Sequence, residues 1–184
     1  GDVYKRQFLD APSDWQPPDP LMNFLESGPP PIYIGFGSMS NRNPEEVTEI
    51  SLHALSKTGQ RGILLGGWGG MGHGNLPDHV FALDAAPHDW LFPRMAAIVH
   101  HGGAGTTAAS LRSGVPSILT PFFADQPFWG GRVHALGAGP APIPRKTLTA
   151  ARLSKAIDQA LSDTAMQNTA RLVGESIRGE DGVK

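Results

Sequence analysis

From Ile32 onwards, short apolar runs alternate with helix-forming stretches, and several of the runs end in glycines. The run Ile32–Phe36 leads into Gly37 and Ser38, and a helix is expected over Pro44–Ser56, with proline in its first turn. A chain that alternates in this way builds a parallel sheet covered by helices on both faces. We therefore expect an α/β fold with a Rossmann-like sheet. The other strands are expected at Gly62–Leu65, Val80–Leu83, Ala96–His100 and Val115–Thr120, and the other helices near Thr106–Ser113, Pro127–Leu136, Ala150–Ser162 and Ala165–Ile177.

Residues 1–31 are rich in proline. Because proline interrupts helices and sheet ladders, Leu21–Glu26 is the one short helix expected there. A domain seldom begins with so long a lead, so we interpret residues 1–31 as an interdomain linker and residues 32–184 as one domain, with an N-terminal partner domain absent from the chain. Gly1–Gln7 matches no useful pattern and is interpreted as a remnant foreign to the linker.

Composition excludes several classes of function. The 184 residues contain 15 Lys+Arg and 17 Asp+Glu, so the chain lacks the positive excess of a general nucleic-acid or membrane-surface binder. Cysteine is absent, which excludes disulfides, thiolate zinc sites and a cysteine nucleophile. The seven histidines include no H-x-x-x-H pair, and no metal site is expected. No apolar run approaches the roughly 20 residues that cross a bilayer. We expect a cytoplasmic domain.

The glycines gather at strand-to-helix junctions, which is where parallel sheets bind their ligands. The strongest junction runs from His100 to Thr107 as HHGGAGTT. Its glycines let a phosphate approach the backbone, and the N–H groups of the next helix attract the anion. His101 can donate an N–H, and Thr106 or Thr107 can cap the helix or donate a hydroxyl. The alternative is a tight turn with a satisfied histidine. At the weaker junction, Gly35–Met39, a structural turn is the favoured interpretation.

A second interpretation of the same junction stays open. Gly103–Ala108 fits the dinucleotide fingerprint G-x-G-x-x-G/A, and Asp125 lies about twenty residues further on. That fingerprint normally opens the first strand–helix unit of its domain, whereas several units precede this one, and Asp125 follows a loop rather than a strand tip. The NAD(P)-binding domain of an oxidoreductase is therefore the alternative. Asp125-Gln126-Pro127 is itself either a helix N-cap or a carboxylate–amide pair for vicinal sugar hydroxyls, and both can hold at once.

Five short motifs occur in order along the chain. They are Gly35–Ser38 (GFGS), Ala86–Pro93 (APHDWLFP), His100–Thr107 (HHGGAGTT), Gly114–Pro116 (GVP) and Pro121–Trp129 (PFFADQPFW). With these motifs the chain resembles the C-terminal, nucleotide-sugar-binding half of family 1 glycosyltransferases, and within them the sterol 3β-glucosyltransferase branch. The resemblance runs from about Trp15 to Val183. The dinucleotide interpretation explains one motif of the five.

The resemblance implies one half of a GT-B fold, in which two Rossmann-like domains face each other across the active site. It also implies an inverting hexosyltransferase that needs no metal or cofactor and transfers a sugar from a UDP-sugar, UDP-glucose being the expected donor. The acceptor would be a sterol or another lipid-like hydroxyl compound. By this resemblance the diphosphate is held by Ser38, His101, Gly103, Gly105 and Thr106, the sugar by Asp125 and Gln126, and the uridine by Pro87 and His88.

The chain departs from the family pattern in two respects. Many relatives have a base-stacking tryptophan where this chain has Asp84-Ala85-Ala86. The family's general base, a histidine oriented by an aspartate, belongs to the N-terminal domain, and none of the histidines here matches it. We therefore assign no catalytic residue and expect the chain alone to be inactive. A sugar-nucleotide epimerase and a non-catalytic nucleotide-sugar-binding module are further alternatives.

Overall fold

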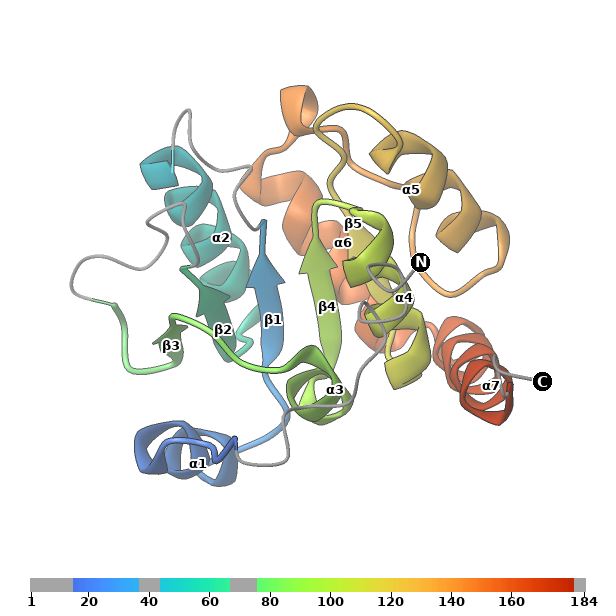
Figure 1. The fold of residues 1–184 in the computed structure, drawn as a ribbon. Coiled ribbons are helices and arrows are strands. Elements are labelled where there is room, and N and C mark those ends of the chain that lie inside the picture. Colours follow the sequence, from blue (N-terminus) through green and yellow to red (C-terminus); the bar gives the residue numbers. More distant parts are fainter. Residues whose placement is uncertain (1–14, 37–43, 67–75, 181–184) are drawn as a thin grey trace.

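A five-stranded parallel sheet forms the centre of the computed structural model, which describes residues 15–36, 44–66 and 76–180. The strand order is β3-β2-β1-β4-β5 (Figure 1). Ile32 of β1 pairs with Gly62 on one side and with Ala97 on the other. The order reverses between β1 and β4, so the switch point at which such sheets bind ligands lies at the carboxyl ends of these two strands. The strands are β1 (Ile32–Gly35), β2 (Gly62–Leu65), β3 (Val80–Leu83), β4 (Ala97–His100) and β5 (Ser117–Leu119).

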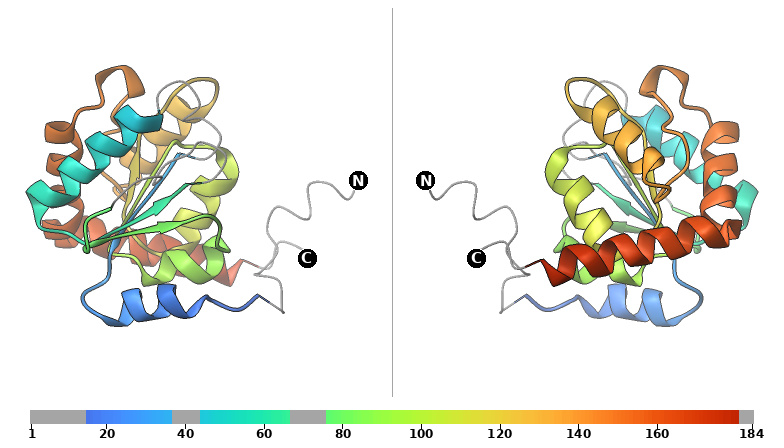
Figure 2. Two further views of the ribbon diagram at one scale, coloured as in Figure 1. Left: turned by 90° about the vertical axis from the view of Figure 1, so that its left-hand side faces the viewer. Right: turned by 90° about the vertical axis from the view of Figure 1, so that its right-hand side faces the viewer.

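Helices cover both faces of the sheet, as expected (Figure 2). Successive strand residues face opposite sides, so Ile32 and Ile34 pack against α2 and α6, while Tyr33 packs toward α1, α3 and α4. The fold class predicted from the alternating pattern is therefore confirmed. The helices are α1 (Asp19–Glu26), α2 (Pro44–Thr58), α3 (His88–Leu91), α4 (Ala104–Ser113), α5 (Gln126–Ala135), α6 (Ala150–Ser162) and α7 (Thr164–Gly179), and short 3₁₀ turns occur at Phe92–Arg94 and Arg145–Thr147.

The proline-rich lead contains a docked helix. The expected Leu21–Glu26 helix is part of α1, which lies by the amino ends of the strands (Figure 1). Leu21 is fully buried in the core on that face. The guanidinium of Arg61 lies 4.2 Å from the ring centroid of Phe24 and donates to the carbonyl of Pro29 over 2.7 Å. Residues 15–31 thus pack on the domain, and their additional role as a linker stays a prediction.

Candidate functional site

Most of the predicted site residues lie where the chain leaves the carboxyl ends of β4 and β5. The segment from His101 to Thr106 leaves β4 and forms the first turn of α4, and Asp125 and Gln126 begin α5. Pro87 and His88 begin α3. Because parallel strands end at one edge of a sheet, segments far apart in the sequence meet there (Figure 1). Ser38, which was predicted to add a donor from the first junction, lies outside the described residues.

Two glycines shape the turn between β4 and α4. Gly102 has a φ of 92°, a conformation that side-chain-bearing residues rarely adopt. A Cβ on Gly102 would also lie 3.2 Å from the backbone carbonyl oxygen of Gln126. A Cβ on Gly103 would lie 2.7 Å from Nε2 of His101. The turn therefore needs glycine at position 102, whereas a side chain at position 103 would displace the His101 ring, which lies against the backbone where α4 begins.

The start of α4 is open to a ligand. Gly103 is its N-cap residue and offers no side chain, and the first helical hydrogen bond is donated by Thr107 N to Gly103 O over 2.9 Å. The N–H groups of Ala104, Gly105 and Thr106 precede that bond, as in every helix start. Ala104 and Gly105 are exposed, and a Cβ on Gly105 would meet nothing within 4 Å. This end of the helix is accessible to an anion.

The expectation that Thr106 or Thr107 caps α4 is wrong. The helix begins at Ala104, so both threonines lie inside its first turn rather than ahead of it. Thr106 is half-buried and remains a candidate hydroxyl donor to a phosphate. Thr107 is 1% exposed, and its Oγ1 has no hydrogen-bond partner within residues 15–36, 44–66 and 76–180.

His101 is half-buried beside the open helix start. Its Nδ1 is buried and finds no hydrogen-bond partner in the described part of the chain, so the satisfied-histidine alternative does not account for it. Burial lowers the pKa of His101, and the carboxylate of Asp125 opposes this shift in part. The two predicted site residues follow neighbouring, paired strands, His101 after β4 and Asp125 after β5. A neutral imidazole here can still donate one N–H to a ligand.

Asp125 presents an exposed carboxylate at the start of α5. It occupies the N-cap position, but its backbone is in the right-handed helical region and its side chain makes no capping hydrogen bond. Instead, Oδ2 accepts from the indole Nε1–H of Trp129 over 2.9 Å. The helix-cap interpretation of this carboxylate is therefore wrong, because the tryptophan one turn along the helix holds it.

Gln126 is 5% exposed, and its side-chain carbonyl oxygen already accepts two hydrogen bonds within the loop. Oε1 accepts from the backbone N–H groups of Phe122 and Phe123, over 2.7 and 3.3 Å. Its Nε2 group keeps the capacity to donate, and a sugar hydroxyl oxygen can accept such a bond. Gln126 thus shapes the β5–α5 loop, in which Ala124 has a φ of 56°.

His88 is the first residue of α3. Its ring stacks on Phe92 with the centroids 4.3 Å apart. Burial lowers the pKa of His88; the charge of Asp89 opposes this, and the charge of His101 adds to it. Pro87 is the N-cap residue of α3. Of the two residues predicted for uridine, His88 thus interacts electrostatically with His101, a residue predicted for the diphosphate.

His100 is the residue that sequence reasoning left out of the site. It is the last residue of β4, is 0% exposed, and interacts electrostatically with His101 and His88. Burial, followed by these two histidines, lowers its pKa to about 3. The one available signal was its position, directly ahead of the glycine-rich turn at a strand end.

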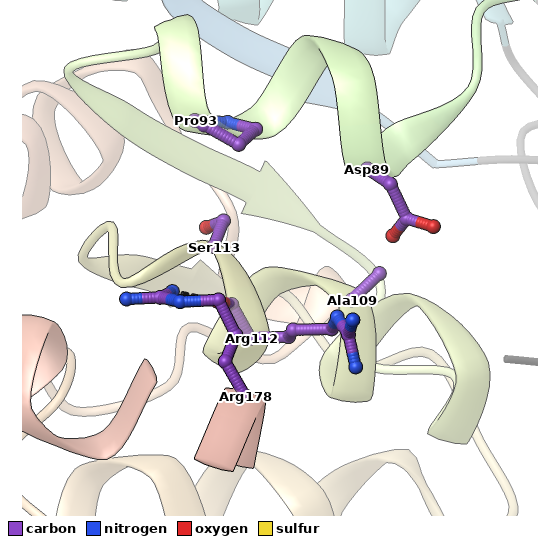
Figure 3. Close-up of a pocket in the computed structure, with 6 residues that line it drawn as sticks. All are labelled: Asp89, Pro93, Ala109, Arg112, Ser113 and Arg178. Carbon is purple, nitrogen blue, oxygen red and sulfur yellow. Dashed lines mark hydrogen bonds between the residues drawn. The ribbon is translucent and has the colours of Figure 1, made fainter. Parts of the chain in front are cut away.

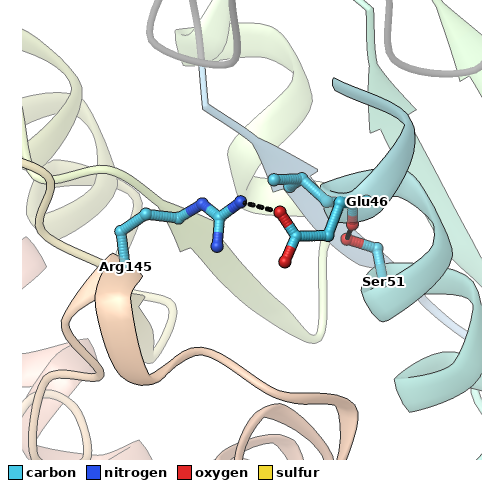
Figure 4. Close-up of polar contacts among 4 residues, drawn as sticks. Glu46, Ser51 and Arg145 are labelled. Carbon is cyan, nitrogen blue, oxygen red and sulfur yellow. Dashed lines mark hydrogen bonds and ion pairs between the residues drawn. The ribbon is translucent and has the colours of Figure 1, made fainter. Parts of the chain in front are cut away.

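An ion pair ties the segment after β5 to α2 at the same edge of the sheet. Nη2 of Arg145 and Oε2 of Glu46 are 2.6 Å apart (Figure 4). The backbone N–H of Arg145 also donates to the carbonyl of Pro121 over 2.9 Å. Within α2, the hydroxyl of Ser51 donates to the carbonyl of Val47. The ion pair is partly exposed, so its contribution to stability is at most about 1 kcal/mol.

A separate pocket of about 330 Å³ lies at the other end of α4. Figure 3 shows Arg178 reaching toward the last turn of α4, where it donates to the carbonyl of Arg112. A helix C-terminus carries partial negative charge, so this end of α4 lacks the anion-attracting N–H groups of its start. The lining residues are Asp89, Pro93, Ala109, Arg112, Ser113 and Arg178.

Residues 15–36, 44–66 and 76–180 contain no group of three or more His, Cys, Asp or Glu placed to hold a metal ion. None of the helices in these ranges has both the length and the apolar character needed to cross a membrane.

The fold is that of one half of a GT-B glycosyltransferase. The glycosyltransferase VinC, solved in complex with DTDP, has a TM-score of 0.71 at 24% identity, over 88% of this chain and 40% of that one. The spinosyn forosaminyltransferase SpnP has a TM-score of 0.72 at 20% identity, over 97% of this chain and 50% of that one. At these identities the likeness concerns the fold.

The sequence places the chain in a family. Residues 65–180 match the C-terminal domain of erythromycin biosynthesis protein CIII-like proteins, and the chain belongs to this family. Two sterol 3-beta-glucosyltransferases of Arabidopsis thaliana are 50% and 45% identical over 99% of the chain, and one of Pichia angusta is 42% identical over 96%. The chain covers 29%, 30% and 15% of their lengths. The predicted resemblance to the C-terminal half of a family 1 glycosyltransferase is confirmed.

Proposed function

We propose that this chain is the donor-binding domain of an inverting glycosyltransferase that uses a UDP-sugar, with UDP-glucose as the donor and a sterol or similar lipid-like alcohol as the acceptor. The observation that carries the proposal is the open start of α4. His101 lies directly ahead of it, and Asp125 follows the neighbouring strand β5. Relatives named sterol 3-beta-glucosyltransferases support the acceptor class. Family membership favours this function over an NAD(P)-dependent oxidoreductase.

The geometry suits the chemistry of the leaving group. When an acceptor hydroxyl attacks the anomeric carbon, the bond to UDP breaks and negative charge grows on the diphosphate. Fixed N–H donors aimed at that charge stabilise the transition state more than the ground state. The N–H groups at the start of α4 and the ring of His101 would supply these donors. Asp125 and the amide of Gln126 would orient the sugar through its hydroxyls.

The base and most of the acceptor site would come from a preceding domain. The chain spans less than a third of the length of the sterol glucosyltransferases described above. Inverting transfer needs a base that takes the proton of the acceptor hydroxyl and a site that holds the acceptor in line with the anomeric carbon. We place both in the N-terminal half of the enzyme, which becomes a partner of this domain across the cleft.

Parallel calorimetric titrations with UDP, UDP-glucose and NADH test the donor assignment. UDP and UDP-glucose should bind, and titrations in the presence of EDTA should give the same affinities, because backbone N–H groups rather than a metal neutralise the diphosphate. Tight NADH binding without UDP binding would instead establish the oxidoreductase alternative.

Turnover distinguishes the enzyme from a pure binding module. The chain alone should form no sterol glucoside, whereas its fusion behind a matching N-terminal half should form one, as followed by mass spectrometry. Robust glucoside formation by the 184-residue chain would place the base and the acceptor site within it. A fusion that folds and binds sterol but transfers nothing would support a binding module.

A further inference from the structure

His100 makes an unusual contact for a buried strand residue. Its Nδ1 accepts a hydrogen bond from the backbone N–H of Gly102, two residues ahead, over 3.1 Å. An imidazole that accepts at Nδ1 and is neutral carries its proton on Nε2. The ring is 0% exposed, and its Nε2 has no hydrogen-bond partner within the described ranges. An apolar residue of similar size would avoid that buried unpaired donor.

The contact acts on the turn that precedes α4. Gly102 is the residue with a φ of 92°, and its neighbours are His101 and Gly103. The backbone of His100 is itself fixed, because its carbonyl accepts from Thr120 N over 2.9 Å across the sheet. The imidazole therefore connects a rigid strand end to the peptide that sets the direction of the turn.

We propose that His100 is a positioning residue for the donor diphosphate, which it serves by fixing the Gly102 peptide and thereby the placement of His101 and the first turn of α4. The proposal rests on the proposed function, since it assumes that the diphosphate binds at this turn. It explains why a histidine with an unpaired nitrogen occupies a fully buried strand end. His100 itself does not touch the ligand.

Two substitutions separate positioning from packing. In His100→Asn the side-chain oxygen can occupy the place of Nδ1 and accept from Gly102, whereas His100→Leu keeps bulk but removes the acceptor. The leucine variant should bind UDP about 3- to 10-fold more weakly, the loss expected for one hydrogen bond. Its affinity for uridine, which lacks the diphosphate, should stay within about 2-fold. The asparagine variant should recover most of the UDP affinity.

A ligand-free measurement keeps the proposal distinct from the proposed function. Hydrogen exchange of the Gly102 amide, followed by NMR, should be slow in the wild type and in His100→Asn, and fast in His100→Leu. If the leucine variant fails to fold, His100→Gln replaces it, because its longer amide reaches the Nε2 position rather than that of Nδ1. His53→Leu, at an exposed position on α2, is the matched control and should change none of these values.

The possible outcomes are separable. Wild-type chain that binds no UDP would overturn the proposed function and, with it, the role of His100 toward a diphosphate. Wild-type binding of UDP with equal losses for UDP and uridine in the leucine variant would show that His100 only packs. Unchanged UDP affinity in that variant, or a Gly102 amide that stays protected, would also overturn the positioning role.

Discussion

The indole Nε1–H of Trp129 donates to Oδ2 of Asp125 over 2.9 Å, so the exposed carboxylate at the start of α5 is held by a residue one turn along the same helix. An exposed aspartate normally samples several rotamers. The indole restricts this one, which lowers the entropic cost of binding a ligand in a fixed orientation. A carboxylate restricted in this way is suited to recognising a pair of hydroxyls.

The substitution Asp125→Asn tests whether the carboxylate binds the sugar hydroxyls. The asparagine oxygen can still accept from Trp129, so the fold should be unaffected. UDP affinity should be almost unchanged, while the additional affinity of UDP-glucose over UDP should fall, because a charged acceptor is replaced by a neutral one. Titration of both ligands checks this. Equal losses for the two ligands would mean that Asp125 acts on the structure of the loop rather than on the sugar.

Trp129→Phe removes the indole donor and leaves Asp125 in place. We expect a smaller loss of UDP-glucose affinity than for Asp125→Asn, with UDP affinity again almost unchanged, because the carboxylate remains but is less restricted. The cost should be about 0.5–1.5 kcal/mol of binding free energy, the usual net value of one hydrogen bond. Calorimetry with UDP and UDP-glucose measures it. If UDP-glucose binds as well as it does to the wild type, the indole has no part in orienting the carboxylate.

The substitution His101→Ala should weaken the binding of UDP itself. The half-buried ring lies beside the start of α4, and a hydrogen bond to a charged group is worth about 1.5–3 kcal/mol. The loss should be of that size for UDP and for UDP-glucose alike, since both carry the diphosphate. Isothermal titration of the two nucleotides gives the comparison, and unaltered UDP binding would exclude the histidine from the diphosphate site.

Gly105→Ala tests whether the ligand approaches the backbone of α4. A Cβ there meets no protein atom within 4 Å, so the variant should gain up to about 1 kcal/mol of stability from helix propensity. UDP should nevertheless bind more weakly, because the new methyl group occupies the space of the phosphate. Gly131→Ala on α5, which is also exposed with nothing within 4 Å, is the control: stability should rise without a change in UDP affinity. Thermal unfolding measures the stability of both variants, and calorimetric titration measures their UDP affinity.

The stability of the domain should depend on pH through His100. Burial, followed by the charges of His101 and His88, lowers its pKa to about 3 in the folded state, whereas an unfolded histidine titrates near its ordinary 6.5. Below that value the unfolded chain binds a proton that the folded chain does not, so the stability present above pH 6.5 is lost progressively as the pH falls toward 3.

Urea unfolding at pH 7 and pH 5.5 measures this loss. His100→Asn should lose about 1 kcal/mol less than the wild type between the two values, since the other titrating groups are common to both chains. Identical losses for the two proteins would show that His100 does not remain neutral in the folded domain.

The sheet could be predicted because its strands are short apolar runs bounded by glycine and proline. Gly62–Leu65 and Val80–Leu83 were predicted at their observed bounds, and Ala150–Ser162 was predicted likewise among the helices. Val115–Thr120 contracted to Ser117–Leu119, since apolar character continues beyond the paired residues. The four-residue α3 was missed because it is barely one helical turn, too short to show a period.

The site was predictable at the level of its loops but not of its contacts. The open start of α4 follows from a glycine-rich stretch after a strand. The burial of His100 depends on α3 and α4 packing over β4, and the Trp129–Asp125 bond depends on the rotamers of both side chains. Neither the burial of His100 nor this hydrogen bond produces a periodic pattern in the sequence. The same holds for the backbone of Asp125, which looks like a capping residue in its sequence context.

The arginine that covers Phe24 has a consequence for where this domain can be divided. Arg61 is the residue directly ahead of β2, and its guanidinium donates hydrogen bonds to the backbone carbonyls of Phe24 and Pro29. Leu21 of α1 is fully buried in the core. A protein trimmed to begin at Ile32 would keep every strand yet uncover the apolar surface that this helix shields. The smallest autonomous folding unit thus includes α1, and truncations or fusions that cut behind it should yield aggregation-prone material.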